Sequence, residues 1–537
     1  TFDPTKPVYF TDAEGNIDKS QVSNGYWNWM TAGSANTMAS VNPLSSTYDY
    51  VNYGSTYRAV GNLQLDYKVH GFEALRANIN LGLDMAKTNG TKYNTPGSIG
   101  SLRSTPDLYE LYENFNKNTL LEAYLDYNET FGKHNVNAMA GYSWQHNFVS
   151  YDNSQYYNND REKEYNIAPN NSREYYLISF FGRFNYNYDS RYLFTFTARG
   201  DASSRFSKAN RWGFFPSAAF AWNIANEEWM EEVETVSALK LRLGWGRTGQ
   251  QDIGDDYYPY LARYYQSPSI TMKYPMLSGE NGSFNVLSPL AYNPNIKWET
   301  TETYNVGVDF GFLNDRISGS VEAYYRNTFD LLNKISIPLG SNFGKELTSN
   351  IGSMVNKGIE LSANFIPVQT RDWNWEIGGN FTFQDVKITK LTNSDEDFKG
   401  VEVGKSMGSN VGFTALHKAG YAPYTYYLYQ QVYDKEGNPI QNALVDRNND
   451  GKINADDRYM TGCSPTPWGY FGFNTQIRYK RWDFGLNGHG SLGAEFINKT
   501  ASGYATSYSD DYTKGYIGNL SATWLLPGWT TANTEAQ

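Results

Sequence analysis

The sequence has 537 residues, of which 16% are aromatic and only 19% are charged, and its formal net charge is -11. The acidic balance and the lack of a basic tract argue against a nucleic-acid partner, and a single cysteine, Cys463, leaves neither an internal disulfide nor a thiolate metal site. No apolar run approaches the roughly 18 residues of a membrane helix. The lack of such a run does not exclude a transmembrane β-barrel, because the strands of a barrel alternate apolar and polar residues.

Alternation of apolar and polar residues predicts β-strands along most of the chain. It begins at 59–69 and returns at 75–85 after a short connection, so we expect these two segments to form a hairpin. The same period of two recurs, in chain order, at 121–127, 136–144, 178–188, 192–198, 239–245, 304–312, 317–325 and 359–365, and near Phe215, Trp375, Phe473 and Phe484. The pattern therefore predicts about fourteen strands of roughly ten residues, the length that crosses a bilayer when tilted.

The connections between these strands alternate between short and long. Short links are expected near Gly71, Gly132, 189–190, 314–315, 369–372 and 480–481, and long polar segments at about 87–118, 146–174, 246–300, 327–355 and 386–468. A soluble sandwich has no reason to place its long loops at one end, whereas an outer-membrane barrel has short periplasmic turns and long extracellular loops. The predicted fold class is therefore all-β, a transmembrane antiparallel β-barrel. The acidic, helix-like link 223–238 is the one long connection on the short-turn side.

The two faces of the predicted strands also favour a membrane barrel. Tyr, Trp and Phe cluster at strand ends, where their rings suit the headgroup level of a bilayer. The polar face, expected to line the lumen, carries many charges: Arg76, Asp84, Glu122, Asp126, Arg183, Arg199, Arg242, Asp309, Arg316, Glu322 and Arg326. A soluble β-protein with an aromatic core is the alternative, but a sealed core could not bury so many charges.

Several long motifs resemble those of a known family. They are RYLFTFTARGDASSRF at 191–206, LKLRLGWGRTGQQDI at 239–253, and the segments 211–217, 298–309, 349–360 and 445–462. These segments resemble the barrel of the SusC/RagA-like TonB-linked outer-membrane transporters, and the resemblance spans nearly the whole chain. It implies a protein of the outer membrane of a Gram-negative, Bacteroidetes-like bacterium.

The resemblance also implies an architecture and a set of partners. The family barrel has 22 strands, holds an N-terminal plug and is covered by a SusD-like lipoprotein lid. On this basis we expect residues 1–537 to be a partial barrel of about fourteen strands, without the plug, the TonB box and the last strands. The implied partners are the SusD-like lipoprotein, TonB through the missing N-terminal region, outer-membrane lipids, and a second transporter–lid pair in a dimer.

The functional hypothesis is an importer of oligosaccharides that has no catalysis of its own. Two alternatives stay within membrane barrels: an importer of peptides in the same family, and a surface adhesin that binds glycans without transporting them. A soluble glycan-active enzyme would instead need a carboxylate pair across a cleft.

The segment from Asp446 to Asp457 resembles a calcium-binding EF-hand loop and lies in the long extracellular loop expected at 386–468. Loop positions 1, 3, 5, 7 and 12 would supply the ligands, the seventh through its backbone carbonyl: Asp446, Asn448, Asp450, Lys452 and Asp457. Asp at position 12 is shorter than the usual Glu. The alternative is a turn in which Asp and Asn side chains accept from backbone amides without a metal.

Two groups of tyrosines are the candidate substrate contacts. They are Tyr257, Tyr258, Tyr260, Tyr264 and Tyr265 in one loop, and Tyr424, Tyr426 and Tyr427, with Tyr421 and Tyr429, in another. Flat rings stack on sugar faces, but tyrosine is also enriched at protein interfaces, so contact with the lid protein is an equal interpretation.

Two further motifs are expected to be structural. Gly404-Lys405-Ser406-Met407-Gly408 has the letters of a nucleophile elbow without its strand–turn–helix setting, and it lacks the upstream glycine of a P-loop, so a plain turn is predicted. Asp201 and Arg205 are expected to form a salt bridge within their loop.

Overall fold

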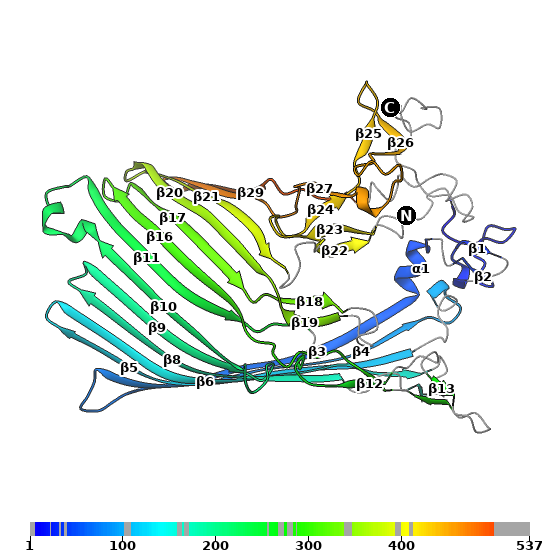
Figure 1. Cartoon of the computed structure of the whole chain (residues 1–537), viewed down its shortest axis with the longest axis horizontal. Helices are drawn as coiled ribbons and strands as arrows, with labels where there is room; N and C mark the ends of the chain where they lie inside the picture. Colours follow the sequence, from blue (N-terminus) through cyan, green and yellow to red (C-terminus); the bar gives the residue numbers. More distant parts are fainter. Residues whose placement is uncertain are drawn as a thin grey trace.

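The computed structural model describes residues 6–498, except 22, 32–33, 37–39, 101–108, 158–163, 166–170, 255–256, 267–272, 276–282, 286, 338–345, 392–398 and 407–411. One curved antiparallel sheet forms the wall of the molecule (Figure 1). Its strands follow each other in chain order: β3 (Tyr50–Lys68), β4 (Leu75–Asn94), β5 (Tyr109–Phe131), β6 (His134–Tyr157), β8 (Asn171–Tyr188), β9 (Tyr192–Ser203), β10 (Trp212–Asn223), β11 (Val236–Gln250), β16 (Glu299–Phe312), β17 (Ile317–Phe329), β20 (Ser353–Gln369), β21 (Trp373–Lys390), β28 (Gly469–Tyr479) and β29 (Trp482–Leu492). The predicted fourteen-strand antiparallel wall is confirmed, and β7 (Glu164–Tyr165) adds a short pairing to β6.

Short strands and helical turns outside the large sheet make up the rest of the described structure. The short strands pair as β1 (Met30–Thr31) with β2 (Ser34–Ala35), β12 (Tyr264–Gln266) with β15 (Leu287–Pro289), β13 (Lys273–Pro275) with β14 (Ser283–Asn285), β18 (Leu332–Ser336) with β19 (Glu346–Asn350), and β25 (Gln431–Tyr433) with β26 (Pro439–Leu444). A four-stranded sheet contains β22 (Val401–Ser406), β23 (Phe413–His417), β24 (Thr425–Leu428) and β27 (Tyr459–Met460). The helical pieces are α1 (Pro43–Tyr48) and the 3-10 turns Ser23–Gly25, Ile224–Asn226, Glu228–Met230 and Ala455–Asp457. In the described ranges, no helix is long and apolar enough to cross a bilayer.

The short and long connections lie at opposite ends of the wall, as predicted. Figure 1 shows the tight turns at the left, which we call the turn end, and the small sheets at the right, which we call the loop end. Asp189 and Ser190, in the three-residue turn between Tyr188 and Tyr192, adopt left-handed φ values of 53° and 57°. The acidic link after β10 also lies at the turn end, where Arg191 bonds Asp189 at 2.8 Å and Glu227 at 3.3 Å.

Several strands extend further towards the loop end than predicted. β4 and β5 continue through much of the segment expected to be a loop at 87–118, and β21 runs to Lys390, so the long loop begins there rather than at 386. In the β4 extension both faces are polar; Thr88, for example, pairs with Asn114. The backbone ladder therefore continues where the hydrophobic period has ended.

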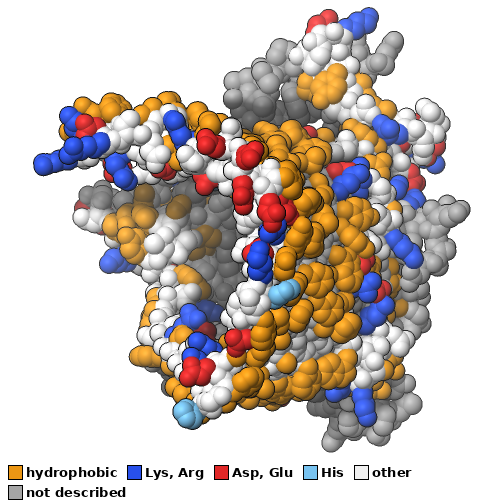
Figure 2. Space-filling model, turned by 90° about the vertical axis from the view of Figure 1, so that its left-hand side faces the viewer, with side chains coloured by type: hydrophobic (Ala, Val, Ile, Leu, Met, Phe, Trp, Pro, Cys, Tyr) orange, Lys and Arg blue, Asp and Glu red, His pale blue; other side chains and the backbone are white. Residues whose placement is uncertain are grey.

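The two faces of the wall separate apolar from charged side chains. Leu241 and Val308 pair on one face, and Arg242 on the other bonds both Asp309 and Glu322, at 2.9 and 2.8 Å. The outer face carries large apolar side chains that are exposed: Leu63, Leu65, Leu81, Leu125, Phe180, Phe184, Phe194, Phe196, Leu243, Val306, Ile359, Leu361, Phe383 and Phe484. Figure 2, from the turn end, shows a broad hydrophobic surface on the outside of the wall. Such a surface favours a wall that faces lipid over the soluble alternative.

One residue of the expected lumen set does not lie there. Arg316 belongs to the turn between β16 and β17, where its guanidinium donates to the backbone oxygens of Ile366 and Pro367 at 3.1 and 2.6 Å. Strand β17, with its alternation of inner and outer residues, begins only at Ile317. The predicted alternation was therefore extended one residue too far, into the turn.

Candidate functional site

The predicted substrate and metal residues all lie in or beside short strands of the loop-end segments. Tyr257, Tyr258 and Tyr260 precede β12, which contains Tyr264 and Tyr265; Tyr424 precedes β24, which contains Tyr426 and Tyr427; and Asp446–Asp457 lies between β26 and β27. Figure 1 shows β12 and β24 well apart at the loop end. The two tyrosine groups therefore form two surfaces and not one cluster.

Arg205 is the centre of the first surface. Its guanidinium carbon lies 4.3 Å from the ring centroids of both Tyr175 and Tyr257, and these rings meet edge to face at 5.8 Å. The arginine side chain is only 6% exposed, and its Nη1 donates to a carboxylate oxygen of Asp252 at 3.1 Å. The expected salt bridge between Arg205 and Asp201 is wrong, because Asp201 instead accepts from Nε of Arg199 at 2.8 Å.

The other tyrosines of this group divide into anchors and an exposed ring. The Tyr258 hydroxyl donates to the backbone oxygen of Glu174 at 2.7 Å, and burial raises the pKa of Tyr258, which keeps the donor protonated. Tyr260 packs against the apolar cluster described next. Tyr264, in contrast, is 66% exposed. Tyr265 lies in β12, but its side chain is outside the described part of the chain.

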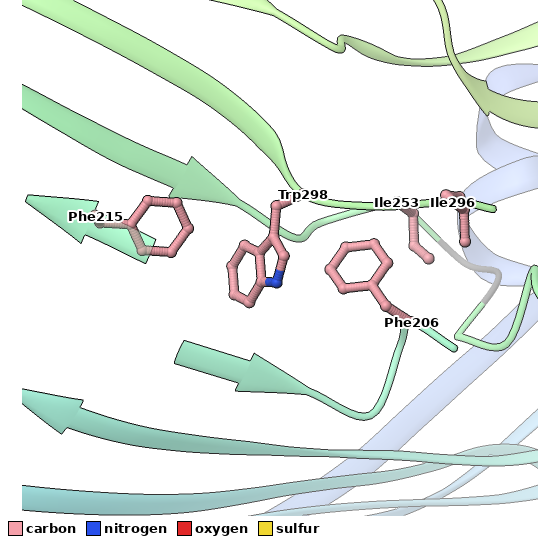
Figure 3. Packing of buried hydrophobic residues seen from close by; sticks show 5 residues of the cluster. All are labelled: Phe206, Phe215, Ile253, Ile296 and Trp298. Atoms are coloured by element: carbon pink, nitrogen blue, oxygen red, sulfur yellow. The ribbon is translucent and has the colours of Figure 1, made fainter. Parts of the chain in front are cut away.

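An apolar cluster fastens these loops to the end of the wall. It consists of Phe206, Phe215, Ile253, Ile296 and Trp298, and Figure 3 shows the Trp298 ring between the two phenylalanine rings. The centroid of Trp298 lies 5.4 Å from each of them, and its Nε1 donates to the backbone oxygen of Arg211 at 2.8 Å. A Cβ at Gly213 would lie 2.4 Å from the Phe215 ring, so this close packing requires glycine. No local sequence pattern indicates this cluster, since its members come from four separate segments.

A buried arginine organises the second surface. Arg458, whose side chain is 4% exposed, pairs with Glu402 at 2.9 Å and donates to the backbone oxygens of Tyr427 and Phe413. Its guanidinium carbon also lies 4.3 Å from the Tyr427 ring centroid. Arg458 therefore joins β22, β23 and β24. No local motif signals this role, because Glu402 and Arg458 are 56 residues apart.

The remaining tyrosines of the second surface again differ in exposure. The Tyr426 hydroxyl donates to the backbone oxygen of Glu495 at 2.9 Å, which makes Tyr426 an anchor. Tyr424 adopts a left-handed φ of 58°, meets the His417 ring edge to face at 4.7 Å and is 48% exposed. Burial lowers the pKa of His417, so its imidazole is neutral at physiological pH. Among the predicted tyrosines whose side chains the structure describes, Tyr264 and Tyr424 are the most exposed.

The segment from Asp446 to Asp457 is a tight loop held by side chain to backbone hydrogen bonds. Asp446 accepts from the amide of Gly451 at 2.8 Å, and the buried Asp457 accepts from the amides of Arg447 and Asn454 at 2.9 and 2.8 Å. These amides, chiefly that of Asn454, hold the pKa of Asp457 below its ordinary value. The bonds are those expected of an Asx-rich turn.

The same loop has the donor atoms for a hard cation. Asp446, Asn448, Asp450 and the carbonyl of Lys452 are oxygen ligands of the type that Ca²⁺ prefers. Across the described ranges, however, no three His, Cys, Asp or Glu side chains converge as metal ligands. Both interpretations of the segment are compatible with its fold, and calcium binding stays a prediction.

Comparison with known proteins agrees with this architecture. The family model described as TonB dependent receptor-like, beta-barrel matches residues 7–536. The TonB-dependent receptor SusC of Bacteroides thetaiotaomicron is 37% identical over 536 residues, which cover 96% of this chain and 51% of the relative. The TonB-dependent receptor P3 of Formosa agariphila is 33% identical over 422 residues, which cover 73% of this chain and 41% of the relative. The chain thus spans about half the length, or less, of these curated relatives.

Solved structures show the same fold. The RagAB peptide transporter matches with a TM-score of 0.70 and 22% identity, covering 91% of this chain and 52% of that chain. The RagAB peptide importer in its closed-closed state matches with a TM-score of 0.69, also at 22% identity and with the same coverage of both chains. At this identity the likeness concerns the fold.

Proposed function

Because the chain belongs to the TonB-dependent receptor β-barrel family and its wall is part of an outer-membrane barrel, we propose that the intact protein imports oligosaccharides across the outer membrane. The observation that carries this proposal is the pair of exposed rings, Tyr264 and Tyr424, on two loop-end surfaces beside a wall with a charged inner face. Flat tyrosine rings offer an apolar face for a sugar ring and a hydroxyl for its polar edge.

The proposal includes the partners that such import needs. A SusD-like lipoprotein would cover the loop end, TonB would supply energy through a part of the protein outside this sequence, and transporter–lid pairs would associate as dimers. The relation to SusC supports this assignment. Import of peptides is the second candidate, because the RagAB peptide transporter has the same fold. A barrel that only binds glycans is the third.

Uptake assays on living cells separate these candidates. The gene is deleted, and uptake of labelled oligosaccharides and labelled peptides is compared with that of the complemented strain. We expect loss of oligosaccharide uptake alone. Loss of peptide uptake alone would replace the first candidate with the second, and unchanged uptake of both, with reduced glycan binding to cells, would favour the adhesin.

The exposed rings should contribute directly to substrate affinity. We expect Tyr264→Ala and Tyr424→Ala each to weaken oligosaccharide binding by about 1 kcal/mol, roughly fivefold, because each removes one stacking surface. Calorimetry on the purified intact protein measures this change. Tyr433→Ala is the matched control, since Tyr433 is an exposed ring of β25 outside both groups. Lid association is measured separately by co-purification; a change there with unaltered substrate affinity would assign the rings to the lid.

Calcium binding to the Asp446–Asp457 loop is a separate proposal, with a structural role. We expect calcium removal with a chelator to increase proteolysis between 391 and 468, and Asp450→Asn to abolish the calcium effect. The amide oxygen of the variant can still accept from the backbone amide of Lys452, as Asp450 does at 2.8 Å. The assay is run at neutral pH, because Asp457, with its lowered pKa, stabilises the loop above about pH 4 and loses this effect as pH falls through that pKa. Equal proteolysis with and without calcium would leave the Asx-turn interpretation.

A further inference from the structure

A band of aromatic and charged side chains crosses the outer face of the wall near its loop end. The strand register places five of them in one row across β11, β16, β17, β20 and β21: Trp245, Tyr304, Tyr325, Lys357 and Asp385. The next row on this face, one step closer to the loops, contains Arg247, Glu302, Asn327, Val355 and Lys387.

The charged band borders directly on the apolar surface. The adjacent row towards the turn end contains only apolar residues, most of them exposed: Leu243, Val306, Ala323, Ile359 and Phe383. Successive residues on one face of a strand are about 6.6 Å apart. On this face Lys357 is next to Ile359 of the apolar row, and Lys387 is separated from Phe383 of that row by Asp385 alone. Both lysines therefore lie close to the hydrocarbon-facing surface, at the level where aromatic girdles meet headgroups.

Two lysines share one carboxylate in this band. The Nζ atoms of Lys387 and Lys357 lie 3.1 and 3.9 Å from the same oxygen of Asp385, and the lysine side chains are 54% and 61% exposed. This cluster therefore has a surplus positive charge. Elsewhere in the band charge is balanced, because Arg247 pairs one to one with Glu302 at 3.2 Å.

The position and the charge together select a type of ligand. An exposed ammonium group binds a phosphate as a point charge, and basic clusters at a membrane surface attract anionic lipid headgroups. A lipid whose headgroup met the lysines would lay its acyl chains along Ile359 and Phe383. We propose that Lys357 and Lys387, of which the single carboxylate of Asp385 neutralises only one charge, bind the phosphate of a lipid headgroup in the outer leaflet.

The test measures lipid binding to the intact protein purified in detergent. Native mass spectrometry compares bisphosphorylated lipid A with the same lipid after phosphate removal. We expect each lysine to contribute roughly fivefold to the affinity for the phosphorylated lipid, so the double variant K357Q/K387Q should bind it more than tenfold more weakly. The variant R247Q, which removes a cation of the same band from a balanced pair, should bind it nearly as the unaltered protein does.

A variant that is expected to bind the phosphorylated lipid more tightly shows that weaker binding by the double variant is not caused by misfolding. Asp385→Asn leaves both lysines and raises the surplus charge, so it should bind the phosphorylated lipid more tightly. Equal binding of the phosphorylated lipid by all four proteins would overturn the proposal and leave the lysines as ordinary interfacial anchors. Equal binding of the lipid with and without its phosphates would also overturn it, as would full displacement by inorganic phosphate at the concentration of the lipid.

Discussion

Arg458→Met should open the four-stranded sheet at the loop end while the wall stays intact. The substitution removes the cation of Glu402 and the donor to the backbone oxygens of Tyr427 and Phe413. Breaking such a buried group of contacts costs about 3 kcal/mol, less than for a fully enclosed pair because Glu402 can regain water. We expect faster amide hydrogen exchange in β22, β23 and β24, and unchanged exchange in β9–β11.

Arg447→Met provides the control for that result. Arg447 also lies over a tyrosine ring, at 4.4 Å from the Tyr459 centroid, but it is exposed and donates to the side chain of Gln430. Its loss should change exchange in the same strands little. If the two variants had equal effects, the burial of Arg458 would not be what holds the sheet together.

Trp298→Ala should have the largest effect on the wall itself. It leaves a cavity between Phe206 and Phe215 and removes the hydrogen bond to Arg211. Removing a large buried aromatic side chain costs about 3–5 kcal/mol. We expect a lower free energy of unfolding in detergent, together with loss of exchange protection at 203–211.

Two further substitutions separate packing from hydrogen bonding at this position. Trp298→Phe keeps most of the ring and loses the donor, so we expect a smaller cost of about 1–2 kcal/mol. Trp229→Ala removes an exposed tryptophan at the turn end and should change stability little. A Trp298→Ala protein as stable as the Trp229→Ala protein would contradict the role assigned to the cluster.

The wall could be predicted because its physical cause is local. A strand with lipid on one side and water on the other must alternate, so residues such as Leu63 and Leu81 mark both the strands and their outer face. Within each hairpin, the register between the two strands then follows from the short turn. The prediction ended early where both faces are polar, as at Thr88, because no hydrophobic period remains there to be read.

The loop-end contacts could not be predicted because their causes are distant in the chain. Tyr258 and Tyr426 were candidates for substrate contact, yet each donates to a backbone oxygen, 84 and 69 residues away in the sequence. Likewise, Arg205 lies four residues from Asp201 but pairs with Asp252. The sequence shows where tyrosines are concentrated. Only the fold shows which tyrosines donate to the backbone of another segment and which have exposed rings.

The chain-order pairing of the wall strands has a consequence for how easily the loop end can change. Every wall strand pairs with the preceding wall strand, whether the connection is the turn 370–372 or the excursion 391–468. Loop-closure entropy grows only with the logarithm of length, so each doubling of a connection costs roughly 0.6 kcal/mol. Insertions into the long loops, and exchanges among them, should therefore change the free energy of folding of the barrel very little. The same wall can therefore support many different sets of loop-end segments. The surfaces that these segments form can change without changes in the membrane-spanning strands.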